Sequence, residues 1–363
     1  MRIVYFLSHD ITKNDGVTKK VADQVGEWSR QGHTVSVYCV APTVGDSLLL
    51  AFRRPAKLRH FLGKLIPDYV LLQEIAAFEP DIVYVRYELW HATYGKIILR
   101  FPCVVEVNSL DDQELTLQAK TVPSIRRLVR KYSNRVFRRI IFRRVVGIVA
   151  VTKEIANHVA IRRFQKPVVV VPNGIDLCKY TILKRMKSDT ESTQLFFVGS
   201  PGQPWHGVDH MERMALHFPD WHFHFVGMKK PDTFNCTYHG YLSQIEYRRV
   251  LENCHVCIGT MALRRNHMQE ACPLKVREYL AYGFPVIIGY TDTAWAESEQ
   301  PNWLLRVSEE LPDMEMIRSF VNRNRDVVVP REEVERIDVR NVERSRLKFL
   351  SRFVAKRDGA ALP

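Results

Sequence analysis

The chain has 363 residues, of which 46% are hydrophobic and 26% charged, and its formal net charge is +13. This length suits two domains of about 150 to 200 residues, and the composition is that of a soluble globular protein rather than a disordered one. The sequence has no run of about 18 apolar residues, which argues against a membrane-spanning helix. The seven cysteines, an odd number, fit free thiols in a reducing compartment better than a disulfide framework.

Short apolar runs alternate with amphipathic stretches, a pattern typical of βαβ units and a mostly parallel sheet. The polar residues within the opening MRIVYFLSHD favour a first strand over an export signal, so we expect a cytoplasmic protein. A helix is predicted over Val17–Gln31. The predicted strands of the first half are Ile3–Leu7, Thr34–Val40, Ile82–Arg86, Val104–Val107, Gly147–Val151 and Pro167–Val171.

The polar stretch Thr181–Thr193 separates this half from a second one that repeats the same alternation. The predicted strands of the second half are Leu195–Val198, Trp221–Val226, Thr237–His239, Val256–Ile258 and Phe284–Ile288. Its predicted helices are Val208–His217, Ser243–Asn253 and Leu274–Tyr282, and a terminal helix is expected over Val342–Lys356. We therefore predict domains over residues 1–185 and 190–338, with residues 340–363 packing back on the first.

The segment from Glu270 to Gly283 carries the clearest chemical signal. Pro273 suits the first position of a helix and Gly283 the position after its end. The free N–H groups at such a helix start, together with Lys275, predict a site for a diphosphate. Glu270 and Glu278 would lie about 12 Å apart on one helix, which suits contact with two hydroxylated ends of an extended ligand.

This Glu-x7-Glu pair, followed by Tyr279-Leu-Ala-Tyr-Gly-Phe-Pro-Val286, resembles the retaining GT-B glycosyltransferases, in particular glycosyltransferase family four. The resemblance extends over most of the chain, through Val171–Asp176 and Phe197–Gly199. It implies two Rossmann-like domains that face each other across a cleft. It also implies transfer from a nucleoside diphosphate sugar, with UDP or GDP as the nucleotide, retention of configuration, and no need for a metal or another cofactor.

The resemblance also assigns roles to residues of this sequence. Glu270 would contact the donor sugar and Glu278 the ribose. Asn108 stands where many family members have a histidine, and its amide can hydrogen-bond a hydroxyl but cannot act as an acid or base. His206 replaces the lysine of a Lys-Gly pair, which leaves Lys275 as the expected cation. The remaining predicted site residues are Gly16, Gly199, Pro273 and Leu274 for the donor, and His91 and Asp111 for the acceptor.

The positive charge gathers in the first half, where Lys120–Arg144 carries ten Lys or Arg residues and no acidic one. Apolar residues recur in this stretch at near-helical spacing. It is therefore either a basic amphipathic surface that contacts anionic lipid or a core-packing helix with a solvated basic face. A lipid-linked or polysaccharide-precursor glycan acceptor, in a lipopolysaccharide or capsule pathway at the cytoplasmic face of the inner membrane, would account for the charge.

Three other functions stay open at the level of sequence. A GT-B sugar-nucleotide epimerase shares the fold and would work without an acceptor. A degenerate transferase, suggested by the missing histidine and Lys-Gly features, would bind nucleotide without turnover. A nucleic-acid-binding protein would use the basic first half, but the sequence carries no recognised motif of that kind, and we predict no nucleic acid partner.

Overall fold

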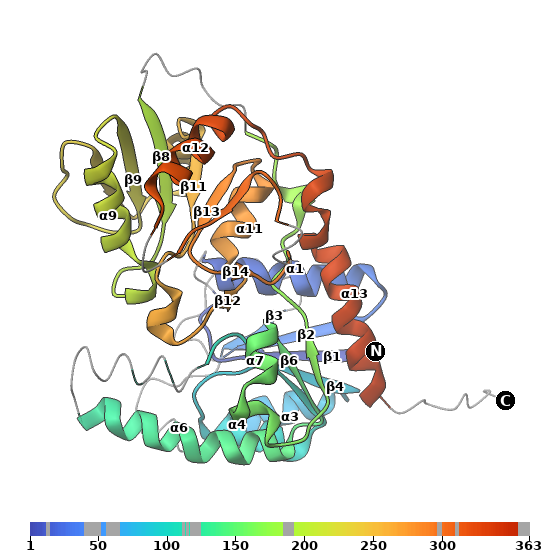
Figure 1. Cartoon of the computed structure of the whole chain (residues 1–363). Helices are drawn as coiled ribbons and strands as arrows, with labels where there is room; N and C mark the ends of the chain where they lie inside the picture. The colour runs from blue at the N-terminus through green and yellow to red at the C-terminus, as the bar shows by residue number, and fades with distance from the viewer. Residues whose placement is uncertain are drawn as a thin grey trace. The chain divides into compact units, whose positions relative to one another are not determined.

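The computed structural model describes residues 1–11, 15–39, 52–55, 66–110, 113, 116, 125–183, 192–295, 300–308 and 312–354. The chain divides into two compact units (Figure 1). The first unit contains Met1–Pro172 and Val339–Pro363, and the second contains Asn173–Asp338. The predicted boundary segment, 185–190, lies outside the described residues.

The first unit is built on a seven-stranded parallel sheet with the order β3-β2-β1-β4-β5-β6-β7. Its strands are β1 (Arg2–Leu7), β2 (Thr34–Cys39), β3 (Phe52–Pro55), β4 (Ile82–Arg86), β5 (Cys103–Val107), β6 (Gly147–Ala150) and β7 (Val168–Val170). Its helices are α1 (Gly16–Arg30), α3 (Tyr69–Ala77), α4 (Ala92–Arg100), α6 (Ile125–Arg144), α7 (Lys153–Asn157), α8 (Val159–Arg162) and α13 (Val339–Leu350). The strand order reverses between β1 and β4, and ligands of such sheets bind at the carboxyl ends of the strands there.

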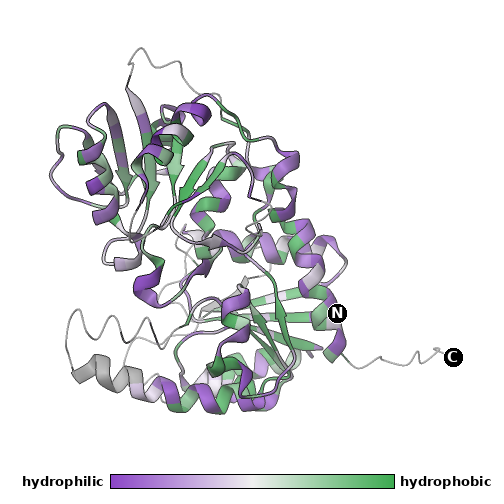
Figure 2. Ribbon diagram, viewed as in Figure 1, coloured by the Kyte–Doolittle hydropathy of each residue, from purple (hydrophilic) through white to green (hydrophobic). Residues whose placement is uncertain are grey.

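The core of the first unit follows from its apolar strands. All but the first residue of β1 are buried, as a central parallel strand covered on both faces requires. Helix α1 turns Val21, Val25 and Trp28 into the same core, and the terminal helix α13 packs against α1. Figure 2 shows hydrophobic residues along the strands and hydrophilic ones on the outer faces of the helices.

The second unit repeats this topology with a six-stranded parallel sheet, ordered β10-β9-β8-β11-β13-β15. Its strands are β8 (Thr193–Val198), β9 (Trp221–Val226), β10 (Cys236–Gly240), β11 (Val256–Ile258), β13 (Val286–Ile288) and β15 (Leu304–Arg306). A separate pair consists of β12 (Glu270–Ala271) and β14 (Thr291–Asp292), and the helices are α9 (Val208–His217), α10 (Gln244–Glu252), α11 (Leu274–Ala281) and α12 (Met314–Asn324). The switch point lies between β8 and β11. The predicted α/β class with two Rossmann-like units is confirmed.

All seven cysteines have free thiols. In the part of the chain that the structure describes, no helix is long and apolar enough to cross a membrane.

Candidate active site

Two glycines shape the carboxyl end of β8, at the switch point of the second unit. Gly227 has a φ of +87°, and a Cβ atom there would lie 2.3 Å from the carbonyl oxygen of Gly199. A Cβ atom on Gly199 would lie 2.7 Å from Nδ1 of His206. A side chain at Gly227 would clash with the backbone of Gly199, and the absence of a side chain at Gly199 allows His206 to pack directly against the end of the strand.

Lys275 lies in the first turn of α11, and its Nζ atom is shielded from solvent although the residue as a whole is partly exposed. Nζ lies 4.2 Å from the centre of the Phe197 ring, and no described group forms a hydrogen bond with it. Burial lowers the pKa of Lys275 to about 7. Because a shielded ammonium group without an anionic partner is costly, this position favours the arrival of an anion.

The start of α11 adds to this preference for an anion. Its N-cap residue is Pro273, and no described side chain caps the first turn. The unpaired N–H groups and the positive end of the helix dipole therefore remain directed toward the space in front of the helix. Predicted donor residues Pro273 and Leu274 both lie at this helix start.

His206 is the second polar side chain near Lys275. Burial, and secondarily the charge of Lys275, lowers the pKa of His206 to about 3. The imidazole is therefore neutral at pH 7, and its buried Nδ1 atom has no hydrogen-bond partner among the described residues. In this arrangement His206 can hydrogen-bond a ligand, while the positive charge comes from Lys275.

Two expectations about the Glu-x7-Glu segment were wrong. Glu270 lies in strand β12, which pairs with β14, and not on the helix that carries Glu278. Pro273 is the N-cap residue, with ψ at 139°, rather than the first residue of the helix, which begins at Leu274 as the predicted range Leu274–Tyr282 has it. The physical reason is that a proline disfavours helical geometry in the residue before it, so the helix cannot extend back to Glu270. The separation of about 12 Å that assumed one helix therefore does not apply.

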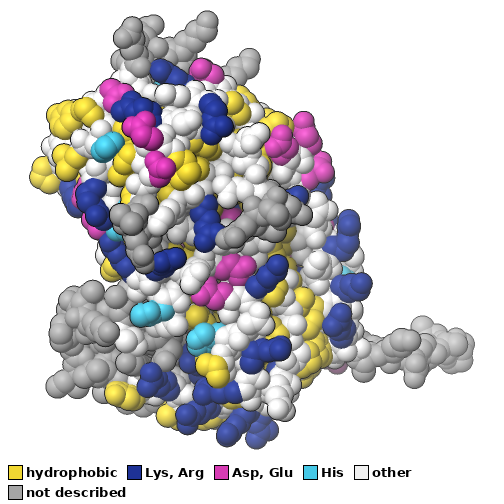
Figure 3. All heavy atoms as spheres, in the orientation of Figure 1, with side chains coloured by type: hydrophobic (Ala, Val, Ile, Leu, Met, Phe, Trp, Pro, Cys, Tyr) yellow, Lys and Arg dark blue, Asp and Glu magenta, His cyan; other side chains and the backbone are white. Residues whose placement is uncertain are grey.

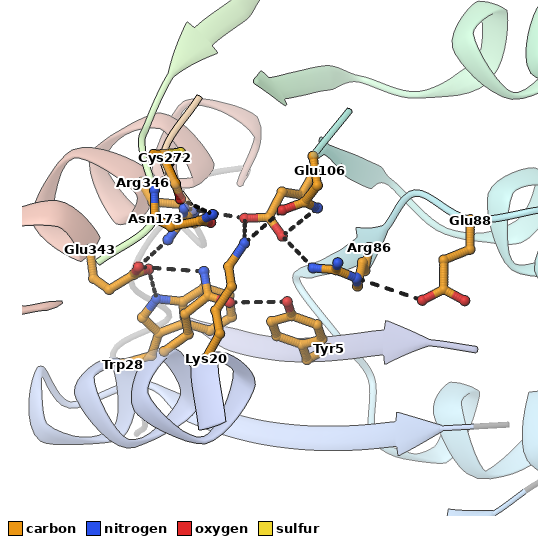
Figure 4. Close-up of polar contacts among 12 residues, drawn as sticks. Tyr5, Lys20, Trp28, Arg86, Glu88, Glu106, Asn173, Cys272, Glu343 and Arg346 are labelled. Atoms are coloured by element: carbon orange, nitrogen blue, oxygen red, sulfur yellow. Dashed lines mark hydrogen bonds and ion pairs between the residues drawn. The ribbon is translucent and has the colours of Figure 1, made fainter. Parts of the chain in front are cut away.

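A buried ion pair that the sequence did not reveal connects α11 to β14. Arg277 donates two hydrogen bonds of 2.7 Å to the carboxylate of Asp292, and both side chains are fully buried. Its Nε also donates to the carbonyl of Asn173. The side-chain amide of Asn173 in turn donates to the carbonyl of Cys272 (Figure 4). The residues just before the helix are thereby fixed in place.

Two predicted residues of the first unit, Gly16 and His91, lie in the segments that follow β1 and β4. Gly16 is the first residue of α1, whose N-terminus is capped by the carboxylate of Asp15. His91 is buried and caps α4, with Nδ1 accepting from the N–H of Tyr94. Its neutral ring then carries the proton on Nε2, which lies 3.0 Å from Oγ of Ser8. The predicted acceptor residue Asp111 lies outside the described residues.

Asn108 follows β5, and its side-chain amide is held from both sides. Nζ of Lys20 donates to its Oδ1 at 2.9 Å, and its Nδ2 donates to Glu106 at 3.2 Å. Lys20 also donates to Glu106 at 2.9 Å. The orientation of Asn108 is therefore set by a buried ion pair, a feature that sequence reasoning missed.

The same ion cluster connects the strands to the terminal helix. Arg346 of α13 lies 3.3 Å from Glu106 and forms an ion pair with Glu343, and all three side chains are buried. Glu343 also accepts a 2.7 Å hydrogen bond from the indole of Trp28. One signal in the sequence was available, because Glu106 interrupts the otherwise apolar strand Cys-Val-Val-Glu-Val.

Electrostatics keep this cluster charged. Burial alone would raise the pKa of Glu106, but the charges of Lys20, Arg346 and Arg86 outweigh burial and hold that pKa well below its ordinary value. Burial lowers the pKa of Lys20 to about 8, against the attraction of Glu106. At pH 7 both groups are therefore ionised, and the cluster is a fixed part of the first unit.

Comparisons with known proteins agree with this architecture. Residues 14–179 match the model of Glycosyltransferase Family 4. No curated protein matches the chain in sequence. Among solved structures, HepE from Anabaena in complex with UDP and glucose is similar with a TM-score of 0.63 and 15% identity, covering 97% of this chain and 100% of HepE.

Two further structures show the same likeness. One is the catalytic domain of starch synthase IV from Arabidopsis thaliana, bound to ADP and acarbose. It is similar with a TM-score of 0.64 and 10% identity, and the alignment covers 98% of this chain and 100% of that domain. The lipopolysaccharide outer core galactosyltransferase WaaB has a TM-score of 0.61 and 14% identity, with coverages of 97% and 100%. These likenesses confirm the predicted GT-B fold.

Proposed function

We propose that this chain, a glycosyltransferase of GT-B type, moves a hexose from a nucleoside diphosphate sugar to a hydroxyl group of an acceptor glycan, with retention of configuration. The observation that carries the proposal is the shielded Nζ of Lys275, which has no described hydrogen-bond partner at the uncapped start of α11. A diphosphate supplies the negative charge that this position needs. UDP and GDP are the nucleotides we expect.

The proposed chemistry depends on the charge that develops as the glycosidic bond breaks. The departing diphosphate gains negative charge, which Lys275 and the N-terminus of α11 would stabilise without a resident metal or other cofactor. We assign Glu270 to the donor sugar and Glu278 to the ribose, with Gly199 and His206 beside the phosphates. In the first unit, Gly16 would allow close approach to the donor, and the fixed amide of Asn108 would hydrogen-bond a sugar hydroxyl, with His91 and Asp111 on the acceptor side.

The acceptor we propose is a lipid-linked or polysaccharide-precursor glycan of an envelope pathway, such as lipopolysaccharide or capsule synthesis. The structural likeness to a lipopolysaccharide outer core galactosyltransferase supports this choice. An acceptor of this kind places the enzyme at the cytoplasmic face of the inner membrane, in peripheral contact with anionic lipid. We expect no nucleic acid partner.

Thermal unfolding with a panel of UDP-, GDP-, dTDP- and CMP-sugars tests the donor site, because a ligand that binds only the native state raises Tm. We expect one nucleotide class to raise the Tm of the wild type and to have no such effect on Glu278→Ala. The matched control is Glu315→Ala, which removes an exposed glutamate of α12 and should keep the full shift. An equal shift in Glu278→Ala, or no shift with any sugar nucleotide, would contradict the assigned site.

The same samples separate the two alternative enzymic assignments. An epimerase would convert the bound sugar nucleotide into its epimer with no acceptor present. A degenerate transferase would show the Tm shift but would release no nucleoside diphosphate when offered membrane glycans. Transfer predicts the release of nucleoside diphosphate only when an acceptor is added.

A further inference from the structure

Helix α6 has an apolar side that packs into the first unit. The ring of Phe137 stacks on Trp90 with 3.9 Å between ring centres, and Ile141 and Phe142 are buried. The packing of this side agrees with the interpretation of the basic stretch as a core-packing helix. It accounts, however, for only part of the apolar residues that recur along the stretch.

The opposite side of α6 exposes three more apolar residues. Tyr132, Val136 and Ile140 are 60%, 56% and 46% exposed. They are spaced four residues apart, so they form one line about 12 Å long on the helix surface. Single exposed side chains of this kind are common on protein surfaces, whereas exposed apolar residues that adjoin one another indicate a binding surface.

Exposed arginines share this line, and we call the whole surface the outer face of α6: Tyr132, Arg135, Val136, Arg139, Ile140, Arg143 and Arg144. At about 100° per residue, Arg143 lies within the arc of the apolar residues, Arg139 lies about 20° beyond its edge, and Arg135 and Arg144 lie farther out on its two sides. Within the described residues, Arg139 and Arg143 form no ion pair or hydrogen bond, and α6 contains no acidic residue. Figure 3 shows basic side chains gathered along the edge of the first unit where α6 runs in Figure 1.

We propose that the outer face of α6 binds the surface of an anionic lipid bilayer. The apolar line would enter the boundary between headgroups and acyl chains, and the arginines would remain among the lipid phosphates. This combination of a basic rim and an apolar line is what an interfacial helix requires. The inference rests on the proposed function, because a lipid-linked acceptor would be presented at such a membrane.

Two other partners fit this surface less well. A second copy of the chain in a symmetric dimer would bring the same arginines opposite one another, and their repulsion would oppose association. A nucleic acid would satisfy the arginines, but it would leave Val136 and Ile140 without an apolar environment. The bilayer is the partner that satisfies both groups.

Flotation of the full chain with vesicles tests the inference. We expect binding to mixed phosphatidylcholine and phosphatidylglycerol vesicles, little binding to pure phosphatidylcholine, and weaker binding at high salt. The double variant Arg139→Gln/Arg143→Gln should bind about 25-fold more weakly, at about fivefold for each cation. The double variant Val136→Ser/Ile140→Ser should bind the vesicles about tenfold more weakly, because less apolar surface enters the bilayer.

Matched controls come from exposed residues of the second unit. Arg213→Gln and Ile245→Ser remove an exposed cation and an exposed apolar side chain there and should leave vesicle binding unchanged. All variants alter exposed positions, so their Tm values should stay close to that of the wild type, which a thermal melt checks.

Two results with vesicles would overturn the inference: no binding of the wild type to anionic vesicles, or binding by both double variants that is as tight as that of the wild type. A third would be binding to an RNA or DNA oligonucleotide that both double variants weaken while their vesicle binding is unaffected. The Tm shift with sugar nucleotides reports on the second unit separately. A preserved shift together with failed vesicle binding would therefore reject the membrane surface alone.

Discussion

Replacing Lys275 with methionine is expected to weaken nucleoside diphosphate binding about 10- to 100-fold while making the ligand-free protein more stable. The loss follows from removing a charged hydrogen-bond donor that faces the phosphates, which is worth about 1.5 to 3 kcal/mol. The gain follows from removing a shielded ammonium group that has no described hydrogen-bond partner. Few buried residues should show opposite changes in binding and stability, so the pair of effects is diagnostic.

The gain in stability should depend on pH in a defined direction. The pKa of Lys275 falls from 10.5 to about 7 on folding, so between these values the unfolded chain binds more protons than the native one. The stability of the wild type therefore rises with pH across this window relative to Lys275→Met. We expect the variant to be more stable by about 1 to 3 kcal/mol near pH 7, and the difference to vanish toward pH 10.

Urea unfolding at several pH values and calorimetric titration with the nucleotide measure both effects. Lys229→Met, which changes an exposed lysine of the same unit, is the matched control and should alter neither quantity. A variant at Lys275 that binds the nucleotide as tightly as the wild type would remove this residue from the donor site. A less stable variant would mean that the ammonium group has a favourable partner in the protein.

Breaking the buried ion cluster of the first unit is expected to have the largest effect on stability. Glu106→Gln leaves the charges of Lys20, Arg86 and Arg346 without their common carboxylate, and Arg346→Met leaves Glu106 and Glu343 short of a cation. Removing one member of a buried ion network costs about 3 to 5 kcal/mol. We expect a loss of this size from each single variant in urea unfolding.

The exposed pair of Arg318 and Asp220 in the second unit supplies the comparison. Arg318→Met should cost under about 1 kcal/mol, since exposed ion pairs contribute little. If Glu106→Gln cost no more than Arg318→Met, the cluster would not stabilise the first unit as its burial indicates. Its role in fixing Asn108 would then also be in doubt.

The sequence was informative where local patterns determine structure. The apolar runs predicted the central strands to within about two residues, because a strand buried on both faces must be apolar throughout. The C-terminal end of α11 was also predictable, since Gly283 adopts a φ of +89° just beyond the last turn. Strands β3 and β15 were missed, because each is short and β3 contains two arginines.

The candidate site was less predictable because it depends on contacts between distant segments. A motif identified the residues of the donor segment. The assumption that one helix carries both Glu270 and Glu278 was wrong, because Glu270 lies in strand β12, before Pro273. The contacts from Lys20 and Arg346 to Glu106 join residues 86 and 240 positions apart, and no local pattern reports such a pairing. Likewise, only the exposed fractions of Tyr132, Val136 and Ile140 show that α6 has two apolar sides.

The central claim, that Lys275 receives a diphosphate, is tested most directly by proton uptake on binding. Calorimetric titrations with UDP and GDP, in two buffers of different ionisation enthalpy, measure this uptake between about pH 7 and pH 9. We predict that the wild type takes up as much as one proton on binding the nucleotide. Its affinity for the nucleotide should weaken by up to about tenfold for each unit by which the pH rises, and Lys275→Met should show neither effect. Binding by the wild type with no proton uptake and no dependence on pH in this range would contradict the claim.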